Sequence, residues 1–253
     1  MHLFLSPHPD DAALSCGALI YRLAHGGASV CVLTVMAASP PPDMLPSAFV
    51  QEHLTRWGLG DDPAPARQSE DRCALAVLGA EVRLGTWPDA LFRTDGQGHL
   101  LYTNLAQLFG VPHSHDPLLR ALDTLIPTDA TITALYAPLG VGGHVDHRLV
   151  RTAALRWAAC RPKVAVFLYE EYPYSAAGVD KVQQARAAVP RPTVVQEFPM
   201  NEAALTAKVR AIACYRSQIS TFWANNADMA RAVRAYARQT EKQHGAERLW
   251  RLG

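Results

Sequence analysis

The first stretch with residues suited to catalysis is SPHPDD, residues 6–11, which places a histidine and two adjacent aspartates directly after an apolar run. These residues are His8, Asp10 and Asp11. Two neighbouring carboxylates repel each other. A loop that tolerates them therefore has either a cation close by or open water around it. The choice lies between a metal site and a solvated loop.

A second polar stretch, GGHVDH at 142–147, supplies His144, Asp146 and His147. Each stretch alone is weak evidence, because the spacings HxxD and HxDH also arise by chance. Together they offer three histidines and three aspartates, each set following a predicted strand. This combination resembles a catalytic zinc site, in which three His, Asp or Glu ligands leave a fourth position for water. We therefore favour a metal site over two solvated loops.

The spacing within the two stretches suggests how the roles are divided. His8 and Asp11 lie three residues apart at a predicted strand-to-helix turn, so both can bind one ion, and His147 can add a third ligand from the facing loop. Asp10 then lies beside the metal without binding it, which is where a general base can take a proton from water. Zinc would lower the pKa of that water to about 7, and Fe2+ is an alternative ion.

The other two residues of the second stretch suit supporting roles. A protonated His144 can stabilise the oxyanion or protonate the leaving group. Asp146 can orient a neighbouring imidazole, as carboxylates behind metal-binding histidines do. The adjacent aspartates of the first stretch are thereby explained, because one binds a cation and both face it.

These side chains need a sheet that brings both stretches to one edge. Residues 2–6 and 29–37 read as buried parallel strands, and the apolar period of residues 12–24 indicates a helix between them. Further strands are expected at 80–85, 131–136, 163–169 and 193–198, and further helices at 67–78, 116–126, 147–160, 201–216 and 226–243. We expect an α/β fold, an open, mostly parallel, Rossmann-like sheet with helices on both faces. Ligands of such sheets bind at the carboxyl ends of the strands.

A single α/β domain can account for residues 1–253. Two segments break the alternation of strands and helices, residues 38–66 around a short helix at 48–57, and residues 86–115. Both are expected to be loop insertions that shape the site. A C-terminal helical segment is expected near 220–253.

Composition excludes several classes of protein. A net charge of +1 gives no argument for binding nucleic acid or an anionic membrane, and no apolar run reaches the roughly 18–20 residues of a membrane span. The five cysteines are scattered without a CxxC pair, which favours buried, reduced thiols over a disulfide framework. The N-terminus has no basic region before its apolar run, so we expect a cytoplasmic protein without a secretory signal. A homo-oligomer is compatible with the sequence.

Several motifs together resemble those of the PIG-L/LmbE-like zinc-dependent N-deacetylases, whose pattern is approximately (A/P)HPDDE…HPDH. SPHPDDAALSCGALI and the later HVDH match this pattern. Three accessory motifs are also similar to the family's, namely Arg67 with Glu70, Ala74 and Leu78-Gly79, the segment Trp87-Pro88-Asp89, and Lys208 with Tyr215 and Gln218. The resemblance spans about residues 1–220.

The resemblance implies hydrolysis of an N-acetyl group, commonly on a small N-acetylglucosamine-containing molecule. It implies zinc on His8, Asp11 and His147, a general base at Asp10, and the transition-state and orienting roles for His144 and Asp146. It also implies that Arg67 and Asp89 contact the sugar. On the residues alone, Arg67 could equally form a surface ion pair with Glu70, and Asp89 could cap a turn.

Three positions depart from the family pattern. Ala12 replaces the Glu that follows the two aspartates, Val145 replaces the Pro of HPDH, and Gly142 stands where some members have a Tyr. Because of Ala12 and Gly142, the chain could alternatively be a non-catalytic or degenerate family member that binds a carbohydrate or a metal. The retained Asp10 and His144 argue against this alternative. A metal-dependent phosphoesterase is a third reading, but it usually needs two metals about 3.5–4 Å apart and so more ligands than the sequence offers.

Overall fold

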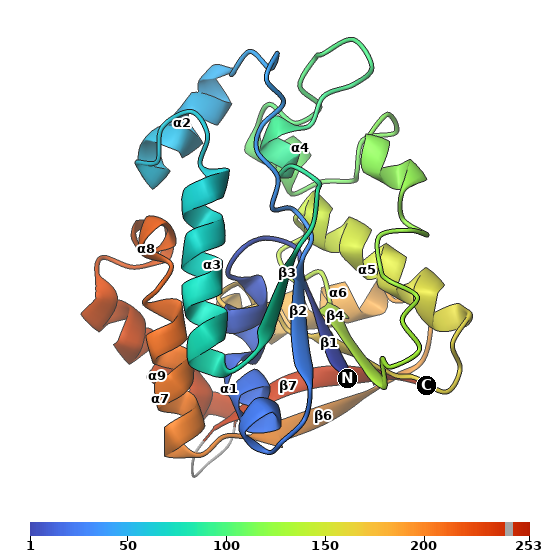
Figure 1. Cartoon of the computed structure of the whole chain (residues 1–253), viewed down its shortest axis with the longest axis vertical. Coiled ribbons are helices and arrows are strands. Elements are labelled where there is room, and N and C mark those ends of the chain that lie inside the picture. The colour runs from blue at the N-terminus through green and yellow to red at the C-terminus, as the bar shows by residue number, and fades with distance from the viewer. Residues whose placement is uncertain (241–244) are drawn as a thin grey trace.

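The chain folds around a seven-stranded sheet, and the computed structural model describes residues 1–240 and 245–253 (Figure 1). The strands are β1 (His2–Ser6), β2 (Val30–Thr34), β3 (Glu81–Leu84), β4 (Ala134–Pro138), β5 (Ala165–Tyr169), β6 (Thr193–Pro199) and β7 (Ala246–Leu252). Their order across the sheet is β3-β2-β1-β4-β5-β7-β6. Strands β1 to β5 are parallel, and β7 is antiparallel to β5 and β6. The expected open, mostly parallel α/β sheet is confirmed.

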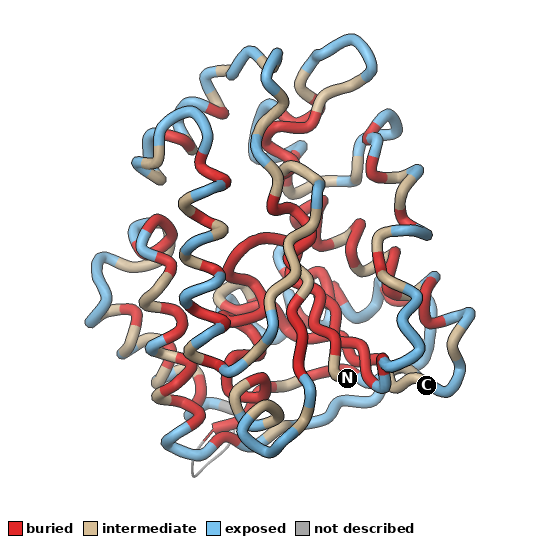
Figure 2. The backbone as a smooth tube through the Cα atoms, in the orientation of Figure 1, coloured by how far each residue is buried: buried red, intermediate tan, exposed pale blue. Residues whose placement is uncertain are grey.

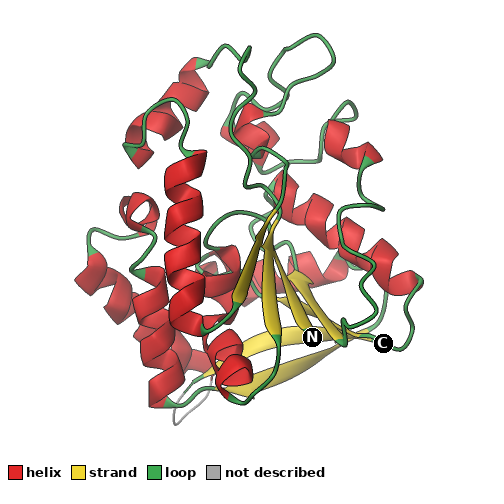
Figure 3. Cartoon of the chain, in the orientation of Figure 1, coloured by secondary structure: helices red, strands yellow, loops and turns green. Residues whose placement is uncertain are grey.

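Helices cover both faces of the sheet (Figure 3). One face carries α1 (Asp11–His25), α3 (Ala64–Leu78) and α7 (Glu202–Ile212), and the other carries α5 (Val145–Ala159) and α6 (Val179–Ala187). The remaining helices are α2 (Ala48–Trp57), α4 (Leu105–Leu108), α8 (Arg216–Phe222) and α9 (Asn226–Thr240), with 3-10 helices η1 (Ala90–Phe92), η2 (Pro117–Arg120) and η3 (Tyr174–Ala177). Within the described residues, no helix has the length and apolar character needed to cross a membrane.

The alternation of side chains along β1 shows how the two helical layers share one sheet. Leu3 and Leu5 belong to the hydrophobic cluster on the α5 face, whereas Phe4 belongs to the cluster on the α1 face. A strand covered on both faces must be apolar at nearly every position, which is why β1 reads as an unbroken apolar run. Buried residues concentrate in these central strands (Figure 2).

The C-terminal strand β7 joins the end of the chain to its first helix. Glu247 on β7 accepts hydrogen bonds from the backbone amides of Ala18 and Leu19 within α1, at 3.0 and 2.7 Å. The same carboxylate pairs with Lys208 of α7 at 2.7 Å. The expected helical segment near 220–253 is therefore wrong at its end. Charged residues interrupt AERLWRL, so its strand character depends on pairing with β5 and β6.

Two further expectations differ from the structure. Residues 116–126 form only the short η2, which starts where the Asp116 side chain accepts a hydrogen bond from the Leu118 amide at 3.0 Å. The short, polar helices α6 and α8 were not expected, because neither has a strong apolar period. The helix expected at 226–243 is α9 as far as Thr240, and residues 241–243 lie outside the described residues.

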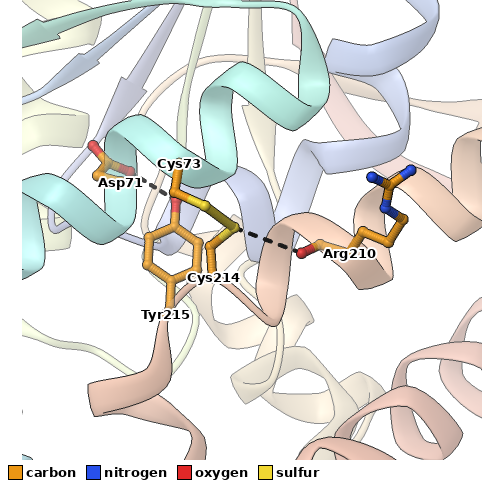
Figure 4. Close-up of a disulfide and its surroundings, with 5 residues drawn as sticks. All are labelled: Asp71, Cys73, Arg210, Cys214 and Tyr215. Atoms are coloured by element: carbon orange, nitrogen blue, oxygen red, sulfur yellow. Dashed lines mark hydrogen bonds between the residues drawn. A yellow bond between two sulfur atoms is a disulfide. The ribbon is translucent and has the colours of Figure 1, made fainter.

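The cysteines contradict the expectation of five buried thiols. Cys73 on α3 and Cys214, just after α7, form a disulfide beside the Tyr215–Asp71 hydrogen bond (Figure 4). Cys160 is an exposed free thiol, while Cys16 and Cys31 are buried. The two bonded cysteines are 141 residues apart in sequence, so no local spacing could reveal the pair.

Candidate active site

The candidate site lies at the carboxyl ends of the central parallel strands. β1 pairs with β2 on one side and with β4 on the other, so the strand order reverses direction at β1. This reversal is the position where open α/β sheets bind their ligands. The segments that follow β1 to β5 supply the side chains described below, and α2 and α4 lie beyond this edge of the sheet (Figure 1).

The turn after β1 has an unusual backbone that presents two aspartates to the site. Asp10 has a φ of 120°, and in the described chain it is the only residue other than glycine with a positive φ. Such a conformation costs energy and is typical of functional sites. The Ser6 hydroxyl fixes the turn by donating to the carbonyl of His8 at 2.7 Å and accepting from the amide of Ala12 at 3.0 Å.

Two of the predicted metal ligands, His8 and His147, converge on a carboxylate oxygen of the third, Asp11. Oδ2 of Asp11 lies 3.3 Å from Nδ1 of His8 and 3.3 Å from Nε2 of His147. Ligand atoms around a tetrahedral zinc ion, with bonds of about 2.0–2.1 Å, are separated by about 3.3 Å. The spacing therefore fits two edges of a tetrahedral site.

A second carboxylate stands behind each of these imidazoles. Nε2 of His8 lies 2.8 Å from Oδ2 of Asp146, and Nδ1 of His147 lies 3.2 Å from Oε1 of Glu171. Protons on these outer nitrogens would leave the inner lone pairs, on Nδ1 of His8 and Nε2 of His147, free for a cation near Asp11. This arrangement is typical of histidines that bind a metal.

Two other groupings of ligand atoms also lie close together. Nitrogen atoms of His8, His144 and His147 lie within 4.8 Å of one another, as do ligand atoms of a group made by His8, His144, Asp89 and Asp146. In the second group, however, Asp146 already engages His8. Nδ1 of His144 accepts a hydrogen bond from the Asp146 amide at 3.2 Å, so His144 is partly committed to the backbone. We therefore favour the set of His8, Asp11 and His147.

Asp146 is itself held by a buried cation. Its Oδ1 forms an ion pair with Nη1 of Arg93 at 2.5 Å, and its Oδ2 accepts a hydrogen bond from the Ala90 amide at 3.0 Å. Arg93 is fully buried and also pairs with Asp116 at 2.8 Å. This chain of charges holds Asp146 toward His8, and the orienting role of Asp146 stays a prediction.

Charges in the site shift its pKa values strongly. Burial, followed by repulsion from Asp11, raises the pKa of Asp10 to about 8, although Arg67 and His8 act in the opposite direction. Burial alone would raise the pKa of Asp11, but His147 and His8 lower it well below its usual value. A bound cation would counter the repulsion on Asp10 and bring its pKa toward neutrality, where a general base works best.

The protonation state of His144 differs from the expected one. Burial and the neighbouring His8 lower the pKa of His144 to about 3, so its imidazole is neutral near pH 7. Because Nδ1 accepts the Asp146 amide hydrogen, the proton of the neutral ring lies on Nε2. His144 can therefore donate a hydrogen bond without carrying a charge.

The two predicted sugar-contacting residues lie together at the site. Nη1 of Arg67 is 3.7 Å from Oδ2 of Asp89, and Nη2 of Arg67 is 3.8 Å from Oδ2 of Asp10. Arg67 is buried, its guanidinium lies over the Trp57 ring, and its Nε has no hydrogen-bond partner among the described residues. Asp89 also caps η1 through a 3.0 Å hydrogen bond from the Leu91 amide. Arg67 therefore does not form a surface ion pair. Asp89 both caps a turn and faces the site.

A pocket of about 230 Å³ opens above these residues. Its outer wall is largely apolar and comes from the two loop insertions and from α8, including Trp57, Leu105, Leu108, Phe109 and Phe222. Tyr174 also lines the pocket, and it lies so close to Gly142 that a Cβ at that position would be 2.9 Å from the ring. A larger residue at position 142 would therefore displace Tyr174.

Sequence reasoning missed three functional candidates, Glu171, Arg93 and Tyr174. The pair Glu170-Glu171 directly follows β5, so the rule that ligands gather at strand ends could have identified Glu171. Arg93 lies in an irregular segment, and nothing local in the sequence indicates its burial. Tyr174 also follows β5 but belongs to no motif.

The chain is similar in sequence to known deacetylases. The family model described as PIG-L, GlcNAc-PI de-N-acetylase, matches residues 3–158. The 2'-N-acetylparomamine deacetylase of Niallia circulans is 30% identical over 186 residues, which cover 68% of this chain and 66% of that protein. The protein of the same name from Streptomyces fradiae is 32% identical over 225 residues, which cover 85% of this chain and 72% of that protein.

Solved structures of related deacetylases have the same fold. The zinc-inhibited form of teicoplanin deacetylase Orf2 superposes with a TM-score of 0.82 at 27% identity, covering 100% of this chain and 97% of that one. The A40926 pseudoaglycone deacetylase Dbv21 superposes with a TM-score of 0.79 at 28% identity, covering 98% and 95% of the two chains.

Proposed function

The chain belongs to the PIG-L family of metal-dependent N-deacetylases, and we propose that it hydrolyses the N-acetyl group of a small amino-sugar-containing substrate. One observation carries the proposal. Asp10 is a buried carboxylate with a raised pKa, and it stands beside the cluster of His8, Asp11 and His147 without forming part of it. A protein that only bound a metal or a sugar would have no need of such a group.

We assign the metal to His8, Asp11 and His147, and we propose zinc as the ion. The donor set supports this choice, because two imidazoles and one carboxylate suit zinc, and each imidazole has a carboxylate behind it. Fe2+ also accepts such ligands. When bound, the ion would polarise the amide carbonyl and make water a stronger acid.

Around this ion, the side chains of the protein would move and place protons. Asp10 takes the proton from the attacking water and returns it to the leaving amine. Nε2–H of neutral His144 donates a hydrogen bond to the oxygen on which negative charge develops. Asp146 keeps His8 in the tautomer that leaves its Nδ1 lone pair toward Asp11.

The pocket supports an amino-sugar substrate. Arg67 and Asp89 can hydrogen-bond sugar hydroxyls at the pocket floor, and Nε of Arg67 is a buried donor without an acceptor among the described residues. The apolar wall suits the ring face of a sugar or a larger attached group. Relatives named for acetylated paromamine and for glycopeptide antibiotics fit this substrate class.

Acetate release tests the proposal directly. The zinc-loaded protein is incubated with a panel of N-acetylated amino sugars, from free N-acetylglucosamine to aminoglycoside and glycopeptide derivatives, and acetate and primary amine are measured together. Equal release of both from at least one member is expected. Metal retention without any release across the panel would instead support the non-catalytic reading.

A further inference from the structure

A second cavity lies on the other side of the loop that joins β4 to α5. It has a volume of about 390 Å³ and is lined by Gly140, Gly142 and Gly143 of the loop, by Arg148 and Arg151 of α5, by Phe109, and by α6 residues that include Lys181 and Gln184. Three cations therefore line the cavity. Among the described residues, no carboxylate lines it.

These cations form no ion pair with a carboxylate among the described residues, whereas a neighbouring arginine does. Arg156, farther along α5, reaches Asp123 at 3.4 Å, whereas no ion pair within the described chain involves Arg148, Arg151 or Lys181. Burial lowers the pKa of Arg151, attraction to the buried Glu171 carboxylate opposes this shift, and repulsion from Arg148 adds to it. A group of like charges in a concave space gains most from an anion that neutralises them.

The glycine loop allows the guanidinium groups to approach the backbone closely. Nε of Arg148 donates to the Gly143 carbonyl at 2.9 Å, and Nη1 of Arg151 donates to the Leu139 carbonyl at 2.6 Å. A Cβ on Gly143 would lie 2.8 Å from Nη2 of Arg148, and one on Gly140 would lie 2.8 Å from Nη1 of Arg151. These contacts fix one edge of each guanidinium group. The remaining N–H groups of Arg148 have no protein acceptor in the described part of the chain.

This cavity adjoins the active-site pocket. Phe109 lines both, and Gly142, which lines the cavity, touches the Tyr174 ring that lines the pocket. Arg148 also follows His147 directly in α5. A ligand in the cavity would therefore lie one loop away from the reacting groups.

We propose that this cavity binds an oxyanion of the phosphate or carboxylate class. Arginine forks and a lysine ammonium are the donors that such anions prefer. The anion has two conceivable sources, a charged group attached to the amino sugar or a separate small anion, and both share this chemistry. Binding itself does not depend on the proposed deacetylase activity.

The first probe is inorganic phosphate, which is titrated into the zinc-loaded protein. Sodium chloride at matched ionic strength is the reference. Calorimetric titration compares the wild type with Lys181→Gln, Arg148→Gln and a matched control, Arg156→Gln, on the same helix. Loss of one charge-assisted contact should weaken phosphate binding roughly tenfold in the first two variants and leave the control unchanged. Lys181 is exposed, and its side chain forms no hydrogen bond or ion pair with the described residues, so its variant keeps the test valid if Arg148→Gln misfolds.

If phosphate bound only at the metal, all four proteins would bind it with equal affinity, and that result would overturn the proposal. Phosphate binding no tighter than chloride binding would also overturn it. A second experiment separates the two sources by comparing KM for N-acetylglucosamine and its 1-phosphate. A lower KM for the phosphate ester that disappears in Lys181→Gln would assign the site to the substrate. Equal KM values with phosphate binding retained would assign it to a separate anion, and absence of turnover would affect the deacetylase proposal alone.

Discussion

Replacing Glu171 with glutamine tests whether the carboxylate behind His147 holds the metal-binding geometry. The fully buried Glu171 carboxylate accepts three hydrogen bonds, from the Gly140 amide at 2.6 Å, the Val141 amide at 3.0 Å and Nδ1 of His147 at 3.2 Å. The amide of glutamine has one oxygen only. Its NH2 group would therefore face one of these donors, and that donor would lose its acceptor.

The size of the effect follows from these three contacts. Leaving one buried donor unpaired costs about 1–3 kcal/mol, and two other bonds lose the benefit of a charged acceptor, about 1 kcal/mol each. Removing a buried charge offsets part of this sum. We therefore expect Glu171→Gln to lower the free energy of unfolding by at least about 2 kcal/mol, and to weaken zinc binding by roughly 10–100-fold, as is usual for carboxylates behind metal ligands.

Urea unfolding and competition with a chromophoric zinc chelator measure the two quantities. The neighbouring Glu170→Gln is the matched control, because the Glu170 carboxylate accepts from Nε1 of Trp250 at 2.9 Å and does not contact His147. The control should keep wild-type zinc affinity. If Glu171→Gln bound zinc as tightly as Glu170→Gln, the reasoning that Glu171 orients His147 would be wrong.

Three further predictions use other features of the molecule. Asp10→Asn should keep its zinc in elemental analysis but lose roughly a hundred- to ten-thousand-fold in kcat for acetate release, and full activity would reject Asp10 as the base. Reduction of the Cys73–Cys214 disulfide, or Cys73→Ser, should lower the free energy of unfolding by about 3–5 kcal/mol because the bond closes a loop spanning 141 residues; an unchanged urea midpoint would contradict this. In metal-free protein, burial lowers the pKa of His147, but attraction to Asp11 and hydrogen bonds to Asp11 and Glu171 raise it to about 9, above its ordinary 6.5. The resulting stabilisation is fully present below pH 6.5 and is lost as the pH rises through about 9, so chelated protein should unfold at lower urea at pH 9.5 than at pH 6.5, whereas an unchanged midpoint would argue against a charged His147.

The sequence predicts the architecture well where periodicity is strong. Buried parallel strands such as residues 2–6 carry an apolar run that few other structures produce, and strand ends then locate His8, Asp11, His144 and His147 near one another. The structure brings these residues together, while their roles stay predictions.

Other features depend on tertiary contacts and leave little local signal. Arg93 is buried because Asp116 and Asp146 surround it, and neither partner is near it in sequence. The strand β7 and the Cys73–Cys214 bond likewise depend on elements far away along the chain. His144 was expected to be protonated because motifs name residue types and say nothing of burial, which here lowers its pKa.

The contact between Glu247 and α1 has a consequence for how the protein is made. The helix that carries Asp11 leaves the ribosome well before Glu247, whose carboxylate accepts the Ala18 and Leu19 amides and lies 229 residues after Ala18 in the sequence. During translation, the first βαβ unit is therefore complete before the Glu247 contact to α1 can form. A nascent chain stalled before residue 247 should lack the fully anchored α1, so metal-binding competence should arise only after residue 247 has emerged.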